Sequence, residues 1–145
     1  MIEIRQPVSA LVVRGVVLLA AAGLVAKQAV SGDGSAWILL IAPAFYLSAM
    51  WALSGVFAQV DRGVAFGPAM VRALRLAGYA LLAGAFAAVI LQPSLIHLIA
   101  NGFTEMRGVR LDWSVANLML ALLGFTLFLI ARRGADLKAR LEEFV

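Results

Sequence analysis

The sequence predicts an all-α, polytopic membrane protein: four transmembrane helices in a bundle, with the N- and C-termini cytoplasmic. Of its 145 residues, 63% are hydrophobic and 14% are charged, whereas a soluble domain has about 45–50% apolar and about 25% charged residues. The apolar residues gather in stretches near the roughly 20 residues that cross a bilayer as a helix. Lys and Arg gather on one side of these stretches, which is typical of cytoplasmic segments.

The apolar stretches predict helices at about 8–30, 36–60, 68–99 and 113–131, followed by a cytoplasmic tail at 132–145, all within a single domain 1–145. Transmembrane strands alternate between lipid-facing and lumen-facing residues, and these stretches show no alternation. Because only helices and closed barrels satisfy the backbone in lipid, uniform apolarity predicts helices.

The residues between the stretches support these boundaries. Gly32 and Gly34 predict a turn after the first helix, which we expect to remain uncleaved because Val-Ala-Lys at 25–27 is a poor signal-peptidase site. Pro68 suits the first position of a helix, where no N–H is needed. Asp112 is a candidate N-cap for the fourth helix.

The orientation follows from the positions of Lys and Arg. Nine lie on the side of the N-terminus, namely Arg5, Arg14, Arg62, Arg72, Arg75, Arg132, Arg133, Lys138 and Arg140. Three lie on the other side, namely Lys27, Arg107 and Arg110. The bias predicts that both termini are cytoplasmic. Trp37 and Trp113 would then lie at the outer interface, where indole rings are favoured.

The chain offers little reactive chemistry. It has no cysteine, which excludes disulfides, thiol catalysis and cysteine-based metal sites, and His97 is its one histidine. No acidic residue lies in the middle of a span, which argues against proton-coupled exchange. We therefore predict no catalytic residues, no metal and no cofactor, and we expect a protein that is not an enzyme. Its positive charge follows the spans rather than a basic stripe, so no direct nucleic acid binding is expected.

Two features inside the spans have alternative interpretations. Arg14 lies about one turn inside the first helix and is either an anchor to lipid phosphate or a contact for gating or a partner. Rows of small residues at i+4 spacing, Ala80-Gly84-Ala88 and Ala44-Ser48-Ala52, serve either packing within one chain or a homo-oligomer.

The loop after the second helix and the tail are the candidate contact site for a partner or for lipid headgroups. This prediction rests on the charged, aromatic and apolar side chains that we expect to be exposed on this face. The predicted contacts are Asp61, Arg62, Phe66, Arg72, Arg75, Arg132, Arg133, Leu137 and Leu141.

The same segments resemble a bacterial four-helix membrane family known as domain of unknown function 2975 (DUF2975). The resemblance rests on Asp-x-Gly-x-x-Phe, here 61–66, an Arg-bearing start of the third helix at 71–75, and a basic, glycine-containing end of the fourth helix at 131–137. It implies no assigned activity. Because members are often encoded beside small helix-turn-helix regulators, it suggests a membrane partner for such a regulator.

The sequence thus leads to a non-enzymatic protein of the bacterial inner (cytoplasmic) membrane. We expect a regulatory or scaffold protein that binds a cytosolic regulator protein through its loop and tail, with the lipid bilayer around its spans. The alternatives are a small oligomeric transporter or pore, and an accessory subunit of a larger membrane complex.

Overall fold

The computed structural model describes residues 8–32, 34–60, 67–101 and 110–143, with the backbone alone described at 35, 36 and 135–143. Within these ranges the chain forms helices and no strands. Four helical stretches are long and apolar enough to cross a membrane, namely Val8–Ser31, Trp37–Val60, Pro68–Ala100 and Val115–Gly134. The prediction of an all-helical protein with four such spans is confirmed.

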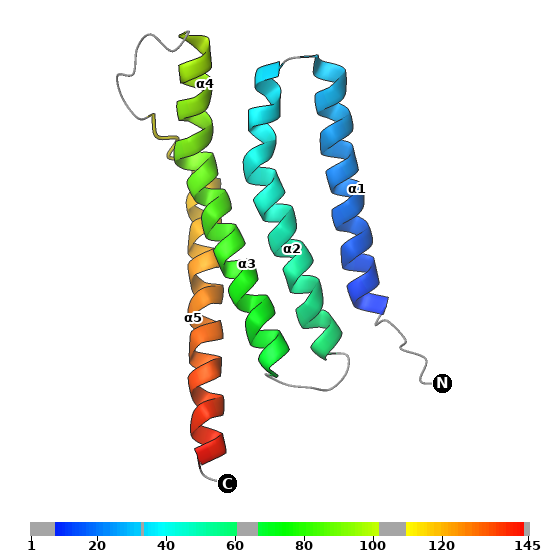
Figure 1. Cartoon of the computed structure of the whole chain (residues 1–145), viewed down its shortest axis with the longest axis vertical. Helices are drawn as coiled ribbons and strands as arrows, with labels where there is room; N and C mark the ends of the chain where they lie inside the picture. The colour runs from blue at the N-terminus through cyan, green and yellow to red at the C-terminus, as the bar shows by residue number, and fades with distance from the viewer. Residues whose placement is uncertain (1–7, 33, 61–66, 102–109, 144–145) are drawn as a thin grey trace.

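Helix α1 (Val8–Ser31) and helix α2 (Ile41–Val60) form an antiparallel pair (Figure 1). Gly32 follows α1 with a φ of 69°, a left-handed conformation that glycine adopts without a Cβ clash. A 3₁₀ helix, η1 (Gly34–Leu40), then leads into α2. The glycine after α1 therefore ends that helix and starts the chain reversal, as predicted.

The third span is built from three segments that run on without a loop. Helix α3 (Pro68–Phe86) begins with proline at its first position, a π-helical turn η2 (Ala87–Leu91) follows, and α4 (Gln92–Ala100) completes the span. The Gln92 N–H bonds to the carbonyl of Ala87, five residues earlier, which is the π pattern. Pro93 has no N–H to donate to the carbonyl of Val89, four residues earlier.

The carbonyl of Val89 accepts a hydrogen bond from outside the helix. The backbone N–H of Asp112, in the segment before α5 (Val115–Glu143), donates to it at 3.0 Å. An unbonded carbonyl is costly in lipid, so this bond compensates for the proline. The prediction of a helix from 113 with Asp112 as N-cap is wrong: α5 begins at Val115, and the Asp112 amide is bound to the third span.

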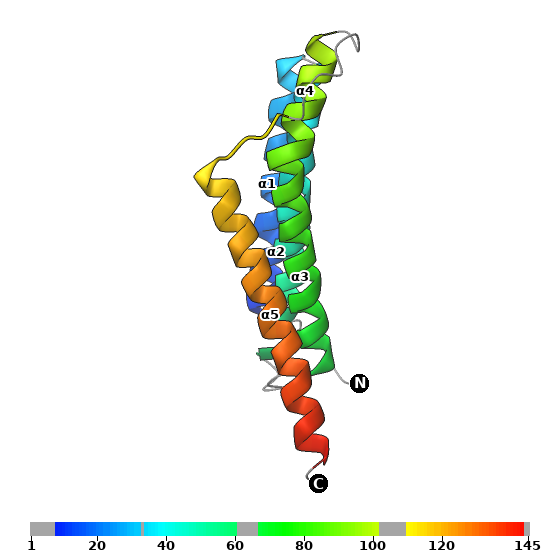
Figure 2. The same cartoon turned by 90° about the vertical axis from the view of Figure 1, so that its left-hand side faces the viewer.

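The helices pack in chain order rather than around a closed core. α3 packs against α2 on one side and α5 on the other, whereas α1 packs mainly against α2. Figures 1 and 2 show this row, with α5 lying across α3 at an incline. The third span is therefore the most buried of the four.

Small residues make the central contacts. One buried cluster joins Ala49 of α2 to Ala77 and Leu81 of α3, and a second joins Ala42 to Ala87 and Ala88. In lipid, association depends on close van der Waals packing, which small side chains allow. The large apolar side chains lie mostly on the outer surfaces, as expected for helices that face acyl chains.

Glycines allow the closest approaches. A Cβ on Gly84 would lie 2.5 Å from Cε1 of the Tyr46 ring, so the ring occupies the place of the missing side chain. A Cβ on Gly78 would lie 3.0 Å from the carbonyl oxygen of Gly124, and one on Gly124 would lie 3.1 Å from that of Gly78. These two glycines therefore face each other where α3 crosses α5.

Candidate functional site

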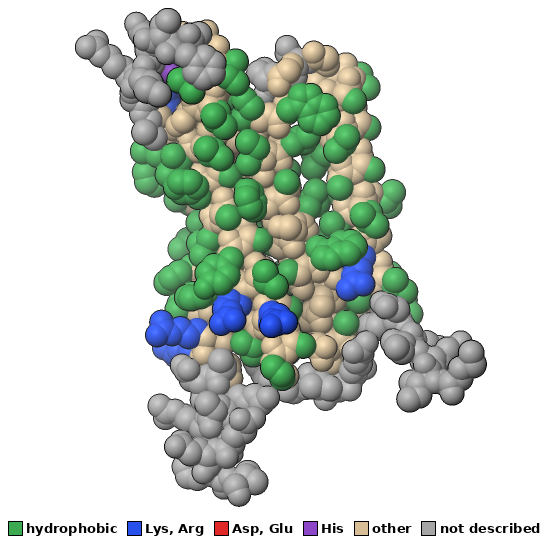
Figure 3. Space-filling model, viewed as in Figure 1, with side chains coloured by type: hydrophobic (Ala, Val, Ile, Leu, Met, Phe, Trp, Pro, Cys, Tyr) green, Lys and Arg blue, Asp and Glu red, His purple; other side chains and the backbone are tan. Residues whose placement is uncertain are grey.

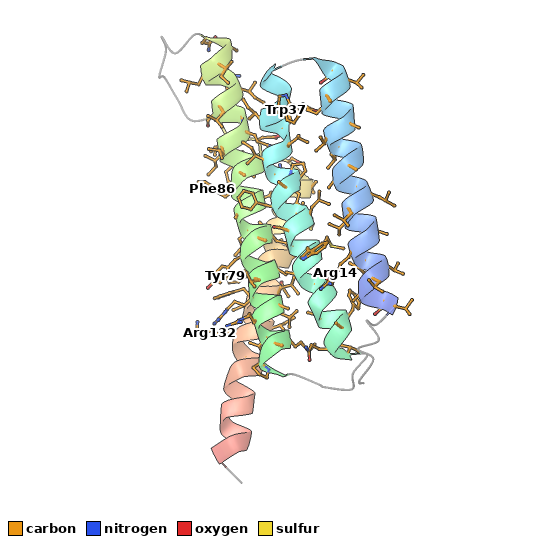
Figure 4. All side chains as sticks on the ribbon, turned by 45° about the vertical axis from the view of Figure 1, so that its right-hand side comes forward. Arg14, Trp37, Tyr79, Phe86 and Arg132 are labelled. Carbon is orange, nitrogen blue, oxygen red and sulfur yellow. The ribbon has the colours of Figure 1, made fainter. Side chains whose placement is uncertain are left out.

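The first residues of α1, the first residues of α3 and the last residues of α5 lie at the same end of the molecule (Figure 1). We call this the basic end, because Arg72, Arg75, Arg132 and Arg133 are exposed there, and Figure 4 shows Arg14 toward the same end as Arg132. Figure 3 shows the gathered Lys and Arg side chains. The structure therefore brings together the predicted arginines of the third helix and those of the fourth.

Two helices position these four arginines. Arg72 and Arg75 are three residues apart, on the first turns of α3, and Arg132 and Arg133 lie near the end of the apolar part of α5. Because α3 and α5 pack together, the two pairs belong to neighbouring helices. Planar guanidinium groups with several N–H donors suit carboxylates and phosphates, so this end can bind an anionic partner surface or lipid headgroups.

Helix α5 continues past the other helices at the basic end (Figure 1). Its apolar part ends at Gly134, whereas the helix ends at Glu143, nine residues later. At 1.5 Å per residue, this extension is roughly 14 Å long. The predicted tail is therefore helical and continuous with the fourth span.

The other predicted contacts are placed less fully. Leu137 and Leu141 lie within α5, but their side chains are outside the described part. Asp61, Arg62 and Phe66 lie outside the described residues.

A polar contact between α1 and α2 lies deeper in the spans. The Nε–H of Arg14 donates to Oγ of Ser54 at 3.1 Å, and Arg14 Cζ lies 5.2 Å from the centroid of the Trp51 ring. Ser54 is fully buried, and its hydroxyl donates to the carbonyl of Trp51 at 2.6 Å. Figure 4 shows Arg14 between the two helices. We call these three residues the Arg14 cluster.

The protein offsets much of the cost of this partly buried charge through neutral partners. An arginine near the centre of a span costs about 2.5–3.5 kcal/mol on insertion scales, less toward the interface. A cation–π contact returns about 0.5–2 kcal/mol, and a hydrogen bond from a charged donor about 1.5–3 kcal/mol. Neither α1 nor α2 contains an acidic residue that could neutralise the guanidinium.

The opposite end of the molecule has a different character. Trp37 is about half exposed at this end, where Figure 4 labels it. Trp113 is about two-thirds exposed, but it follows Asp112, whose amide is bound to Val89, eleven residues before the end of the third span. Nε2 of His97 lies 3.0 Å from the Asn101 side-chain amide. Ser94 Oγ is buried and has no hydrogen-bond partner in the described part, so it forms no serine–histidine pair with His97 there. Trp37, His97 and Asn101 thus give this end the mixed aromatic and polar character that is typical of a membrane interface.

A side-chain bond ties the third span to the start of the second. Nε2 of Gln92 donates to the carbonyl of Ile38 at 3.0 Å. Among the described residues, no group of three or more His, Cys, Asp and Glu side chains is placed to hold a metal ion.

The sequence did not identify the partners of Arg14. A signal was present: Arg14 lies six residues after the start of α1, and Ser54 lies six residues before the end of α2. Residues at matched distances from the ends of two antiparallel helices lie at the same depth. Trp51 lies three residues from Ser54, so it falls on the same face.

Comparison with models of known protein families gave no match. Comparisons with curated proteins and with solved structures gave no significant match either. The resemblance to domain of unknown function 2975 therefore stays a prediction, and the function has to be argued from the geometry.

Proposed function

We propose that the protein is a non-enzymatic regulatory or scaffold protein of the bacterial inner membrane, which binds a cytosolic protein at its basic end. The observation that supports this proposal is the unbroken course of α5 from its span to Glu143, beyond the other helices. A helix that is continuous with a membrane span holds its extension in a fixed direction. A partner can therefore be bound at a defined place above the bilayer.

The four exposed arginines at the base of the extension support an anionic partner surface. Charged residues around such a contact steer the approach of the partner and select against like-charged proteins. The resemblance to the four-helix family suggests a small helix-turn-helix regulator as the partner. In that case the membrane protein would hold the regulator away from DNA and would not bind DNA itself.

The proposal requires the basic end to be cytoplasmic, as the excess of arginine suggests. Because the chain has no cysteine, single cysteines at Ser31, the exposed last residue of α1, and at Ala135 would report the two ends without background. We expect a membrane-impermeant maleimide to label Ser31→Cys in cells whose outer membrane is permeabilised, and Ala135→Cys only after lysis. The opposite pattern would refute the proposed orientation.

Partner binding is tested by photo-crosslinking in living cells. A photoreactive amino acid at Leu137 should give a discrete crosslinked product, which Arg132→Gln together with Arg133→Gln should weaken. The matched control is the same probe at Leu111, which lies toward the other end. A product of equal yield from both positions, or none from Leu137, would contradict the proposal.

A second candidate is an accessory subunit of a larger complex or a homo-oligomeric pore. The observation that favours it is the open packing of α1, which contacts mainly α2 and leaves most of its apolar side chains exposed. Native mass spectrometry in detergent separates the candidates. A strict monomer excludes the shared pore, and a stable heteromeric complex would favour the accessory subunit.

A further inference from the structure

We propose that the Arg14 cluster binds the phosphate group of an anionic membrane lipid at the contact between α1 and α2. This inference rests on Arg14, Ser54 and Trp51 alone, so it does not depend on partner binding at the basic end. The shared chemistry is that of a phosphate oxyanion, and the lipid rather than free phosphate is the proposed source.

The first argument is the fixed orientation of the guanidinium. Its Nε–H is bound to Ser54, and its Cζ lies over the Trp51 ring, so two residues of α2 hold the guanidinium in place. The Nη1 and Nη2 groups carry four further N–H donors, for which the structure gives no partner in the described residues. An oriented fork of this kind suits bidentate binding of a phosphate.

The second argument is the unpaired charge. α1 and α2 contain no Asp or Glu, so a counterion must come from elsewhere. α1 has 24 residues, which span roughly 36 Å, against a hydrocarbon thickness of about 30 Å. If the excess is shared between the two ends, Arg14 Cα lies about 6 Å inside the hydrocarbon boundary. Phosphate groups lie just beyond that boundary, so a lipid that tilts or sinks slightly would bring its phosphate to the Arg14 guanidinium.

The third argument concerns the surroundings, which favour a lipid over a free ion. Leu11 and Leu18, three residues before and four after Arg14, are more than half exposed, and Trp51 is 42% exposed. These apolar surfaces would contact acyl chains beside the guanidinium. A lipid brings its phosphate already anchored by its chains, whereas free phosphate would have to leave water for an apolar site.

The test uses Trp51 as the reporter. Replacement of Trp37 and Trp113 by Phe leaves Trp51 as the one tryptophan of the chain. The protein is reconstituted into phosphatidylcholine vesicles that contain increasing amounts of phosphatidylglycerol with brominated acyl chains, which quench indole fluorescence on contact. We expect the quenching to indicate a local fraction of brominated phosphatidylglycerol roughly fivefold above the bulk fraction.

The controls separate a defined site from general attraction to a basic protein. Arg14→Gln should return the quenching to the bulk fraction, and Arg14→Lys should retain part of the enrichment because it keeps the charge but not the fork. Lys27→Gln, which removes an exposed cation near the other end of α1, should leave Trp51 quenching unchanged. Added salt should reduce the enrichment less than it reduces binding of anionic vesicles to an exposed cationic peptide, because buried pairs are screened less.

Each result decides the matter. Quenching that follows the bulk fraction in the protein with Arg14 overturns the proposal, whatever the folding of the variants. Enrichment that Lys27→Gln abolishes, or that Arg14→Gln preserves, also overturns it. A saturable change of Trp51 emission with inorganic phosphate in a neutral detergent, together with loss of the lipid enrichment when phosphate is added, would assign the site to free phosphate.

Discussion

The crossing of α3 and α5 at Gly78 and Gly124 allows a quantitative prediction for the change Gly124→Ala. The added Cβ would lie 2.8 Å from Cβ of Leu81, 3.1 Å from the Gly78 carbonyl oxygen and 3.2 Å from the Leu82 amide nitrogen. Carbon atoms in contact are about 3.5–4.0 Å apart, so the shortfall to Leu81 is about 1 Å. None of these atoms is the end of a flexible side chain, so the helices themselves must move apart.

The expected cost follows from two opposing terms. Overpacking of a close contact costs about 1–3 kcal/mol, whereas replacing a helical glycine by alanine gains about 1 kcal/mol in helix propensity. The matched control is Gly15→Ala in α1, where a Cβ would meet nothing within 4 Å. The propensity term is common to both variants. The difference between the two variants therefore isolates the overpacking. We expect the free energy of unfolding of Gly124→Ala to be about 1–3 kcal/mol lower than that of Gly15→Ala.

The assay is reversible unfolding in mixed micelles of a mild detergent and dodecyl sulfate, followed by the helical circular dichroism signal. Gly78→Ala provides a second measurement of the same contact, since its Cβ would lie 3.0 Å from the Gly124 carbonyl oxygen and 3.1 Å from the Phe128 amide nitrogen. Equal unfolding midpoints for Gly124→Ala, Gly78→Ala and Gly15→Ala would show that α3 and α5 do not meet at these glycines.

Two more predictions concern the polar bonds between segments. Gln92→Leu removes the bond to the Ile38 carbonyl and should cost about 0.6–1.7 kcal/mol of unfolding free energy in the same assay. Thr126→Val, which removes a hydroxyl bound only to its own helix, should change it by less than about 0.5 kcal/mol, and equal effects would contradict the assignment. Pro93→Ala supplies an N–H that competes for the Val89 carbonyl. The Asp112 amide should therefore exchange its hydrogen faster with solvent, and unchanged exchange would refute its bond to Val89.

The helical spans could be predicted from the sequence because lipid imposes a local requirement. Most residues of a span must be compatible with hydrocarbon, and nearly every backbone group must be bonded, most simply within the helix itself, so apolarity and length are sufficient. The start of α5 could not be predicted in this way. It depends on a carbonyl freed by Pro93, which takes the Asp112 amide from a distant part of the chain. The sequence shows the proline but not the segment that comes to lie beside it.

The faces along which the helices pack were harder to predict. The predicted row on the third helix includes Gly84 and Ala88, which are indeed buried, but Ala44 and Ser48 of the row on α2 are exposed. The buried small residues of α2 are instead Ala42, Ala49 and Ser54. In a soluble protein the polar face marks the outside of a helix, whereas in lipid both faces are apolar and that signal is lost.

The candidate site divides in the same way. The position of the exposed arginines at one end could be predicted. Four spans that alternate in direction place both termini, and the loop between the second and third spans, on the same side. The side-chain partners of Arg14 could not, because they depend on the rotation of α1 about its axis. That rotation is set by contacts such as Ala10 and Val17, which are buried although other residues of α1 are equally apolar.

The Arg14 cluster also explains how α1 is retained. Its contact with α2 is much less extensive than those of α3 with its two neighbours, so it gains less from van der Waals packing. Separation of α1 from α2 would leave the guanidinium in hydrocarbon without Ser54 and Trp51, and it would leave the buried Ser54 hydroxyl without the Arg14 donor. The cost of the buried charge thus becomes a reason for the two helices to stay together. A lipid phosphate bound to the remaining N–H groups would strengthen this association, because it would bind the paired helices and not the isolated α1.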